Sequence, residues 1–127
     1  MSRAAVSVFV FGIYLLVVGA LLVSVPNAFL GLSGLPPTTE VWVRVVGVLV
    51  LCLGTYYTLA ARAGIRDFLR WTVPVRAGVM VFFTVFVVLR LVAPPLLVFG
   101  AVDLAGAVWT ALALRADTLG PAARAGR

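Results

Sequence analysis

The sequence predicts an all-α integral membrane protein, a four-helix bundle with up-down topology in one transmembrane domain, residues 1–127. Three observations predict it. Four apolar runs, residues 5–25, 41–61, 73–93 and 95–114, each provide the ~20 residues that cross a hydrocarbon core. Hydrophobic residues make up 64% of the chain and charged residues 11%, against about 25% charged in soluble domains. The connections are short, so no length remains for a soluble domain.

The first run predicts a membrane helix with a smooth packing face. Ala5, Gly12 and Gly19 recur every seven residues, a spacing that allows a close helix approach. The run exceeds the apolar core of a signal peptide, about 7 to 15 residues, and no A-x-A cleavage site follows it. We therefore expect this helix to remain in the protein.

The outer loop, residues 26–40, mixes helix breakers with regularly spaced Phe and Leu residues. This mixture predicts a compact piece that folds against the bundle and caps its outer face. Thr38 or Thr39 is expected to cap the next helix, with Glu40 in its first turn.

The remaining runs have identifiable starts and packing faces. The second run carries a stripe of polar and small residues at alternating steps of four and three: Glu40, Arg44, Gly47, Leu51, Gly54 and Thr58. The cytoplasmic loop, residues 62–72, is expected to place Trp71 at headgroup level. Thr72 and Pro74 predict the start of the third helix, and Pro94-Pro95 the start of the fourth after a very short turn. The third and fourth helices are therefore expected to be antiparallel neighbours.

Basic residues predict the orientation. They lie before the first run, in the loop at 62–72 and after the fourth run: Arg3, Arg62, Arg66, Arg70, Arg115, Arg124 and Arg127. The first loop has none, and Arg90 is the one exception near the outer side. By the positive-inside rule, both termini face the cytoplasm, as expected of a multi-pass protein of the inner (cytoplasmic) membrane. Arginine without lysine in an Ala, Val and Gly-rich chain is typical of a GC-rich genome and favours a bacterial origin.

Charges inside the apolar runs indicate the candidate site. Asp103 lies about eight residues into the fourth run, ~12 Å below its outer end and near the bilayer centre. An unpaired carboxylate there costs at least ~2.5 to 3.5 kcal/mol. Arg44 and Arg90 each lie about one turn below the outer surface, and Glu40 lies one turn above Arg44. These four residues are predicted to form an outer-half polar network.

Two interpretations of this network remain open. The ions either fix helix register by satisfying one another, or they line a pocket for an amphipathic ligand or a coupled ion. In the second case the ligand head would meet Arg44, Arg90 or Asp103, and its tail would run towards Tyr14. Secondary candidates lie nearer the inner surface, where Tyr57 and Trp109 would surround Arg76; there, the alternative is an interfacial anchor.

Catalytic and metal-binding constellations are scarce. The chain has no His, a single Cys52 in an apolar run and no Gly-rich phosphate loop. The usual general bases, thiol nucleophiles and haem or iron-sulfur ligands are therefore missing, and we predict no catalytic residue, metal or cofactor. Asp103, Glu40 and the tyrosines remain as acid-base candidates, so enzymatic activity is disfavoured but open. The arginines are scattered between apolar runs, which argues against nucleic acid as a partner.

Three features together resemble the DoxX-like group of small four-helix membrane proteins, including its relatives of unknown function. They are the stretch at residues 26–35, the segment Arg44-Val45-Val46-Gly47 with the Leu and Gly residues after it, and an acid in the fourth run. Members of that group are linked to quinone-coupled redox complexes and to chaperoning of membrane proteins. The resemblance implies a small scaffold or subunit with an internal polar site.

The leading hypothesis is a non-enzymatic bundle that binds a quinone or lipid, or a partner membrane protein or second copy, through the Arg44/Asp103 region. A small proton- or ion-coupled transporter is the rival. The small multidrug resistance proteins have four helices in a similar length, but their essential acid lies in the first span, where this chain has only Ser7, Tyr14 and Ser24 as polar residues. A membrane subunit of a redox complex is the third interpretation.

Overall fold

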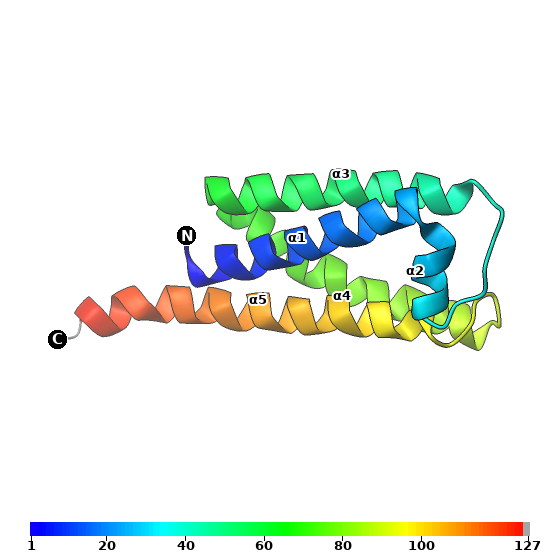
Figure 1. Ribbon diagram of the computed structural model, residues 1–127. Coiled ribbons are helices and arrows are strands. Elements are labelled where there is room, and N and C mark those ends of the chain that lie inside the picture. Colours follow the sequence, from blue (N-terminus) through cyan, green and yellow to red (C-terminus); the bar gives the residue numbers. More distant parts are fainter. Residues whose placement is uncertain (126–127) are drawn as a thin grey trace.

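The computed structural model describes residues 1–125, with side chains described as far as Gly120. Within that range all regular structure is helical: α1 (Arg3–Ser24), α2 (Pro26–Leu32), α3 (Trp42–Ala63), α4 (Arg66–Val88) and α5 (Leu96–Ala125) (Figure 1). The helices α1, α3, α4 and α5 are long and apolar enough to cross a membrane. The predicted all-α class with four apolar helices is therefore confirmed. Arg127 and the side chain of Arg124, two of the predicted basic residues, lie outside the described part.

The pair α1 and α3 packs through glycines on both helices. A Cβ atom added at Gly19 would lie 2.8 Å from the backbone nitrogen of Leu51 and 2.9 Å from the carbonyl oxygen of Gly47. A Cβ at Gly54 would lie 3.0 Å from the carbonyl oxygen of Gly12. Only residues without a side chain allow two backbones to approach this closely. The predicted glycine faces of the first and second runs are therefore confirmed, whereas Glu40 and Arg44, placed on the same face of the second run, are exposed.

The second pair, α4 and α5, is antiparallel and joined by a short connection, as predicted (Figure 1). Gly100 of α5 lies against Met80 of α4, whose sulfur is 2.8 Å from the position of an added Cβ. The helix α5 begins at Leu96, directly after Pro94-Pro95. It continues well beyond residue 114, the predicted end of the fourth run.

The start of α4 differs from the sequence prediction. Residues 62–72 were expected to form a loop and residues 73–93 a helix, but α4 begins at Arg66 and ends at Val88. Gly64 ends α3 in the left-handed conformation (φ 65°), a common helix terminator, and only a short turn follows. Leu69 is 2% exposed in the core, and burying it stabilises helical structure in this segment. Pro74 is thus accommodated inside the helix and does not start it.

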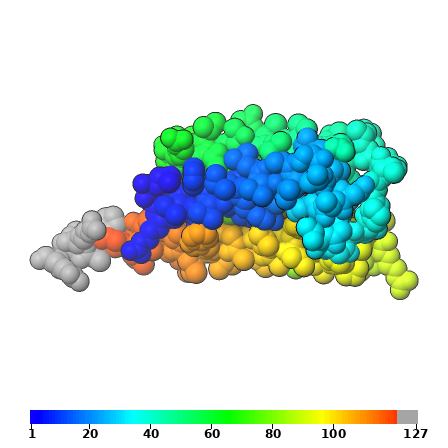
Figure 2. Space-filling model, in the orientation of Figure 1, coloured from blue at the N-terminus to red at the C-terminus, as the bar shows by residue number. Residues whose placement is uncertain are grey.

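The helix α2 forms a compact cap at one end of the bundle, as the sequence predicts for residues 26–40. Figure 1 shows α1 close to α5 near the chain termini and diverging from it towards α2, which lies across the resulting gap. In the space-filling view, α2 covers this end of the bundle between α1 and α5 (Figure 2). Phe29 of α2 packs on Phe99 of α5, with ring centroids 5.6 Å apart. The expected Thr cap of α3 is wrong: its N-cap is Val41 without a side-chain bond, and Glu40 precedes the helix.

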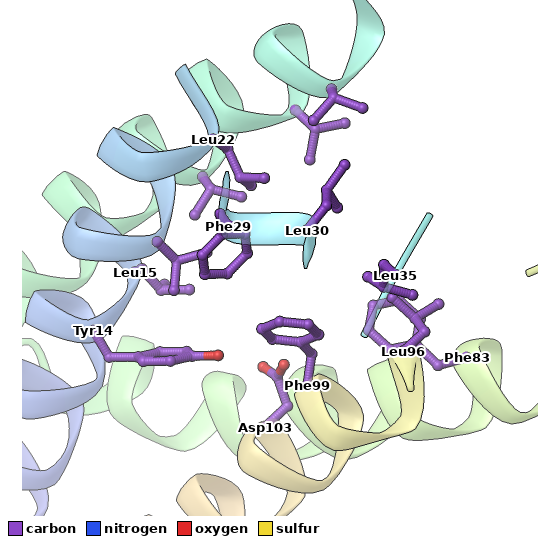
Figure 3. Close-up of a pocket in the computed structure, with 14 residues that line it drawn as sticks. Tyr14, Leu15, Leu22, Phe29, Leu30, Leu35, Phe83, Leu96, Phe99 and Asp103 are labelled. Atoms are coloured by element: carbon purple, nitrogen blue, oxygen red, sulfur yellow. The ribbon is translucent and has the colours of Figure 1, made fainter. Parts of the chain in front are cut away.

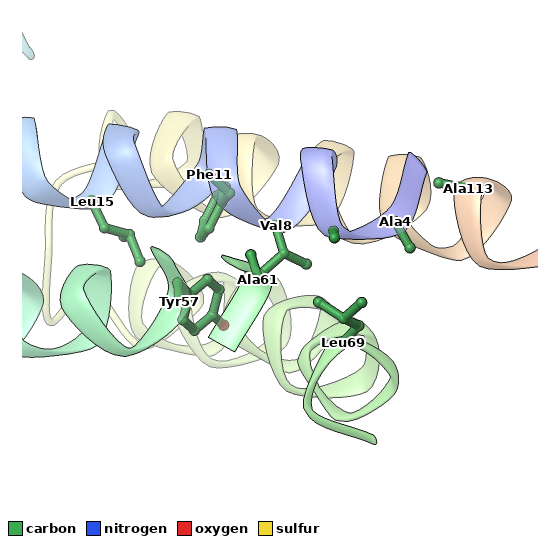
Figure 4. Packing of buried hydrophobic residues seen from close by; sticks show 9 residues of the cluster. Ala4, Val8, Phe11, Leu15, Tyr57, Ala61, Leu69 and Ala113 are labelled. Atoms are coloured by element: carbon green, nitrogen blue, oxygen red, sulfur yellow. The ribbon is translucent and has the colours of Figure 1, made fainter. Parts of the chain in front are cut away.

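The buried core occupies the end of the bundle that holds the termini (Figure 4). Val8 and Ala61 are fully buried there, and Phe11 of α1 packs against Tyr57 of α3 with ring centroids 5.7 Å apart. Asp117 of α5 reaches the start of α1, where its carboxylate accepts hydrogen bonds from the backbone N–H groups of Arg3 and Ala4. The bundle is thus closely packed at one end and splayed at the other.

Candidate ligand site

The splayed end of the bundle contains a cavity of about 290 Å³. It lies between α1, α3 and α5, with α2 over it and Phe83 contributed by α4. Apart from the Tyr14 hydroxyl and the Asp103 carboxylate, the lining is apolar (Figure 3). The lining residues are Tyr14, Leu15, Val18, Leu22, Phe29, Leu30, Leu35, Val43, Val46, Val50, Phe83, Leu96, Phe99 and Asp103. This volume lies at the lower end of the about 300 to 1,000 Å³ typical of ligand pockets.

The polar groups of the cavity are the Tyr14 hydroxyl and the Asp103 carboxylate. Both point into the same space, close to the ring of Phe99 (Figure 3). Within the described residues no hydrogen bond or salt bridge involves either group. Both side chains are half-buried, so their polar atoms border the cavity and are available to an occupant. The cavity therefore offers an acceptor and a hydroxyl within apolar walls.

Arg76 of α4 lies between the cavity and the end of the bundle that holds the termini, and it is 1% exposed. Its Nε donates to the carbonyl oxygen of Thr72 at 3.3 Å, and its Nη2 donates to Oγ1 of Thr110 at 2.6 Å. Thr110 in turn shares a hydrogen bond of 2.8 Å with Ser7 Oγ, which connects α4 and α5 to α1. The guanidinium carbon lies 4.7 Å from the ring centroid of Phe11, a cation-π distance. These contacts stabilise a cation that would otherwise be costly to bury.

One atom of this guanidinium remains without a partner in the described part of the chain. Arg76 Nη1 is buried and unbonded. It lies against Gly106 of α5, where an added Cβ would be 2.9 Å from it. Gly106 follows Asp103 by three residues, and helix positions three apart are neighbours on one face, with Cβ atoms about 5 to 6 Å apart. The free Nη1 therefore lies one helical turn from the acid at the floor of the cavity.

The predicted outer-half network is not assembled. Glu40, Arg44 and Arg90 are all exposed, and within the described residues none of them pairs with Asp103. Arg44 donates instead to the carbonyl oxygen of Val23 at the end of α1. Arg90 lies after the end of α4 with a positive φ of 57°, because that helix ends at Val88. The cation nearest to Asp103 along the packed interface is thus the secondary candidate Arg76.

The other secondary candidates, Tyr57, Trp109 and Tyr14, differ in whether they lie where the sequence predicts. Tyr57 is 4% exposed, and its ring centroid lies 5.9 Å from the Arg76 guanidinium carbon, so the expected proximity of these two residues is confirmed. Trp109 is 46% exposed and makes no aromatic or cation-π contact within the described residues. Tyr14, expected at the tail end of a ligand, lies instead beside the acid. Sequence reasoning missed the aromatic pair of Phe29 and Phe99, since no periodicity links the outer loop to the fourth run.

The cavity brings few chemically active groups together. Among the described residues no cluster of His, Cys, Asp or Glu is arranged to hold a metal ion. The cavity holds one carboxylate and one phenol, without the nucleophile and base pair of covalent catalysis. No protein-family model, curated protein or solved structure matches this chain.

Proposed function

We propose that this chain is a small non-enzymatic membrane protein that binds an amphipathic ligand, such as a quinone or a lipid, in the cavity above Asp103. The observation that carries the proposal is the cavity itself: about 290 Å³ of apolar space with one carboxylate and one phenol at its floor. We further propose that it lies in the inner membrane of a bacterium with both termini in the cytoplasm. The resemblance to the DoxX-like group supports a quinone or lipid as the ligand class.

The unpaired acid supports a ligand with a hydrogen-bond donor in its head group. A carboxylate without a partner at membrane depth costs at least ~2.5 to 3.5 kcal/mol, and a donor from the ligand offsets this cost. The Tyr14 hydroxyl can donate to a carbonyl of the same head group. A quinone in its two redox states presents such carbonyl and hydroxyl groups; a monoacylglycerol presents hydroxyls and an ester carbonyl.

This geometry reverses the ligand orientation expected from the sequence. The head group lies at Asp103 and Tyr14, in the middle of the bundle, and the tail lies among Phe29, Leu35 and Leu96 towards the outer end. An internal ligand is favoured over a partner membrane protein because the acid faces a cavity between the helices. A docked protein would contact the outer surface instead.

The test is ligand copurification with matched variants. The protein is purified in detergent, extracted with solvent, and its bound quinones and lipids are quantified by mass spectrometry. Asp103→Asn removes the negative charge of the acceptor while keeping the shape of the side chain. Loss of this charge should weaken ligand binding about 10- to 100-fold, because a hydrogen bond to a charged group contributes about 1.5 to 3 kcal/mol. Glu40→Gln is the control, because Glu40 is exposed and outside the cavity.

A second pair of variants tests the volume. Val46 and Val48 are each 50% exposed on α3, but only Val46 lines the cavity. Val46→Phe should expel the ligand by filling its space, whereas Val48→Phe should leave copurification unchanged. Equal ligand content in all four variants and the unmodified protein would refute the proposal.

A further inference from the structure

A second cleft lies at the opposite end of the bundle, between the start of α4 and the end of α5. It is lined by arginines from both helices and by leucines: Arg66, Arg70, Leu114, Arg115, Thr118 and Leu119. Its volume is about 360 Å³. The two helices are antiparallel neighbours, so residues that are far apart in the sequence converge here. The arrangement brings three guanidinium groups and one hydroxyl to a single cleft.

One arginine is held across the cleft. Arg66 Nη2 donates to Oγ1 of Thr118 at 2.9 Å, which orients this guanidinium towards α5. Arg115 forms no hydrogen bond or salt bridge within the described residues, so all of its donors are available. A guanidinium presents its N–H groups in a planar fork that matches two oxygens of a phosphate.

The nearby acids leave the cleft positively charged. Asp67 Oδ1 lies 3.8 Å from Arg70 Nη1, and the two exposed residues are one helical turn apart. Asp117 is the other acid at this end, and its oxygens accept the backbone N–H groups of Arg3 and Ala4. Three arginines against the two aspartates Asp67 and Asp117 leave a surplus of one positive charge at the cleft, which favours an anion as the occupant.

The position of the cleft favours a lipid phosphate over a free one. It lies at the start of α4 and near the end of the apolar part of α5, and exposed Trp71 follows Arg70 directly on α4. The ends of apolar helices that span a bilayer, and exposed Trp residues, belong at the depth of the lipid head groups. Leu114 and Leu119 supply apolar surface beside the arginines. Basic clefts between membrane helices bind anionic lipid head groups in this way. We propose that this cleft binds the phosphate head group of an anionic phospholipid, with Arg66 and Arg115 as its ligands and leucines beside its acyl chains.

The site is independent of the cavity above Asp103, which lies at the other end of the bundle. The experiment therefore uses the full chain and a defined probe, phosphatidylglycerol, titrated into detergent-solubilised protein and followed by native mass spectrometry. Arg115→Gln breaks no internal bond and should weaken binding about fivefold, and Arg66→Gln with Arg115→Gln about 30-fold, at about 1 kcal/mol per arginine. Phosphatidylcholine should bind weakly to every variant.

The control removes two charges from the same end without touching the cleft. Arg3 and Arg62 are exposed and do not line it. Arg3→Gln with Arg62→Gln should change phosphatidylglycerol affinity by less than about threefold, because screened surface charges act weakly. An equal loss in this control would overturn the proposal in favour of general surface charge. Inorganic phosphate that displaces phosphatidylglycerol at equal concentration would overturn the lipid assignment in favour of free phosphate.

Discussion

The closeness of α1 and α3 makes a quantitative prediction for Gly19→Ala. The added methyl group would lie 2.8 Å from the backbone nitrogen of Leu51 and 2.9 Å from the carbonyl oxygen of Gly47, whereas ordinary contacts begin at 3.4 Å. Both neighbours are backbone atoms, so neither can rotate away. The two helices must therefore separate by about 0.5 Å along this contact, a gap that forfeits about a quarter of the local dispersion energy.

The expected cost is about 1 to 3 kcal/mol of unfolding free energy, typical of one methyl group forced into a filled interface. Gly78→Ala is the matched control. Gly78 also lies inside a helix, α4, but an added Cβ there would have no atom within 4 Å. The control should be neutral or should stabilise by about 0.5 to 1 kcal/mol, because alanine restricts the unfolded chain.

The assay is reversible unfolding in mixed micelles, with increasing sodium dodecyl sulfate and circular dichroism as the readout. The prediction is the difference between the two variants, with Gly19→Ala unfolding at a lower dodecyl sulfate fraction than Gly78→Ala. If the two variants unfold at the same fraction, the close approach of α1 and α3 contributes nothing to stability and the argument from these distances fails.

Three further outcomes follow from individual contacts. Thr110→Val should lower the unfolding free energy by about 1 to 3 kcal/mol, since Arg76 and Ser7 both lose a buried partner. Thr84→Val is the control and should change the unfolding free energy little, because the Thr84 hydroxyl is exposed and bonds only to its own helix. Equal effects of the two variants would contradict a role for the buried cluster. Asp117→Ala should cost about 0.5 to 2 kcal/mol by leaving two N–H groups of α1 uncapped, which thermal unfolding in detergent would measure, and an unchanged midpoint would contradict the cap. In a Cys52→Ala background, a membrane-impermeant thiol reagent should label Ser33→Cys in intact cells and Thr118→Cys only after permeabilisation; the opposite pattern would place the termini outside.

Much of the fold follows from the sequence because hydropathy and small-residue spacing are local signals. The steps of four and three in the second run place Gly47 and Gly54 on one face, and the structure packs that face on α1. The Pro94-Pro95 pair predicts the start of α5 to within one residue. The start of α4 could not be predicted in this way. It depends on the burial of Leu69, a tertiary contact that overrides the local signal of Thr72 and Pro74.

The error in the site follows from the error in that helix. With a helix over 73–93, Arg90 would face the bundle near its outer end and Arg76 would lie near the inner surface. Because α4 runs from Arg66 to Val88, Arg76 is ten residues from its start, ~15 Å along the axis, and Arg90 is outside it. Local sequence indicates Asp103 as the acid of the candidate site, but the cation near it depends on where a neighbouring helix begins.

The contrast between the two ends of the bundle supports a site at their boundary. Near the termini, buried alanines, Val8 and the Arg76 cluster fill the space between α1 and α5, and their hydrogen bonds join α4 and α5 to α1 below the cavity. Beyond Asp103 the helices diverge, and α2 covers this end of the bundle (Figure 2), with the cavity beneath it. No hydrophobic force closes such a gap in a bilayer, since lipid tails solvate apolar walls as well as protein does. An apolar cavity therefore costs little free energy there, whereas the unpaired carboxylate of Asp103 is costly. The proposed ligand would fill the cavity and donate a hydrogen bond to this carboxylate.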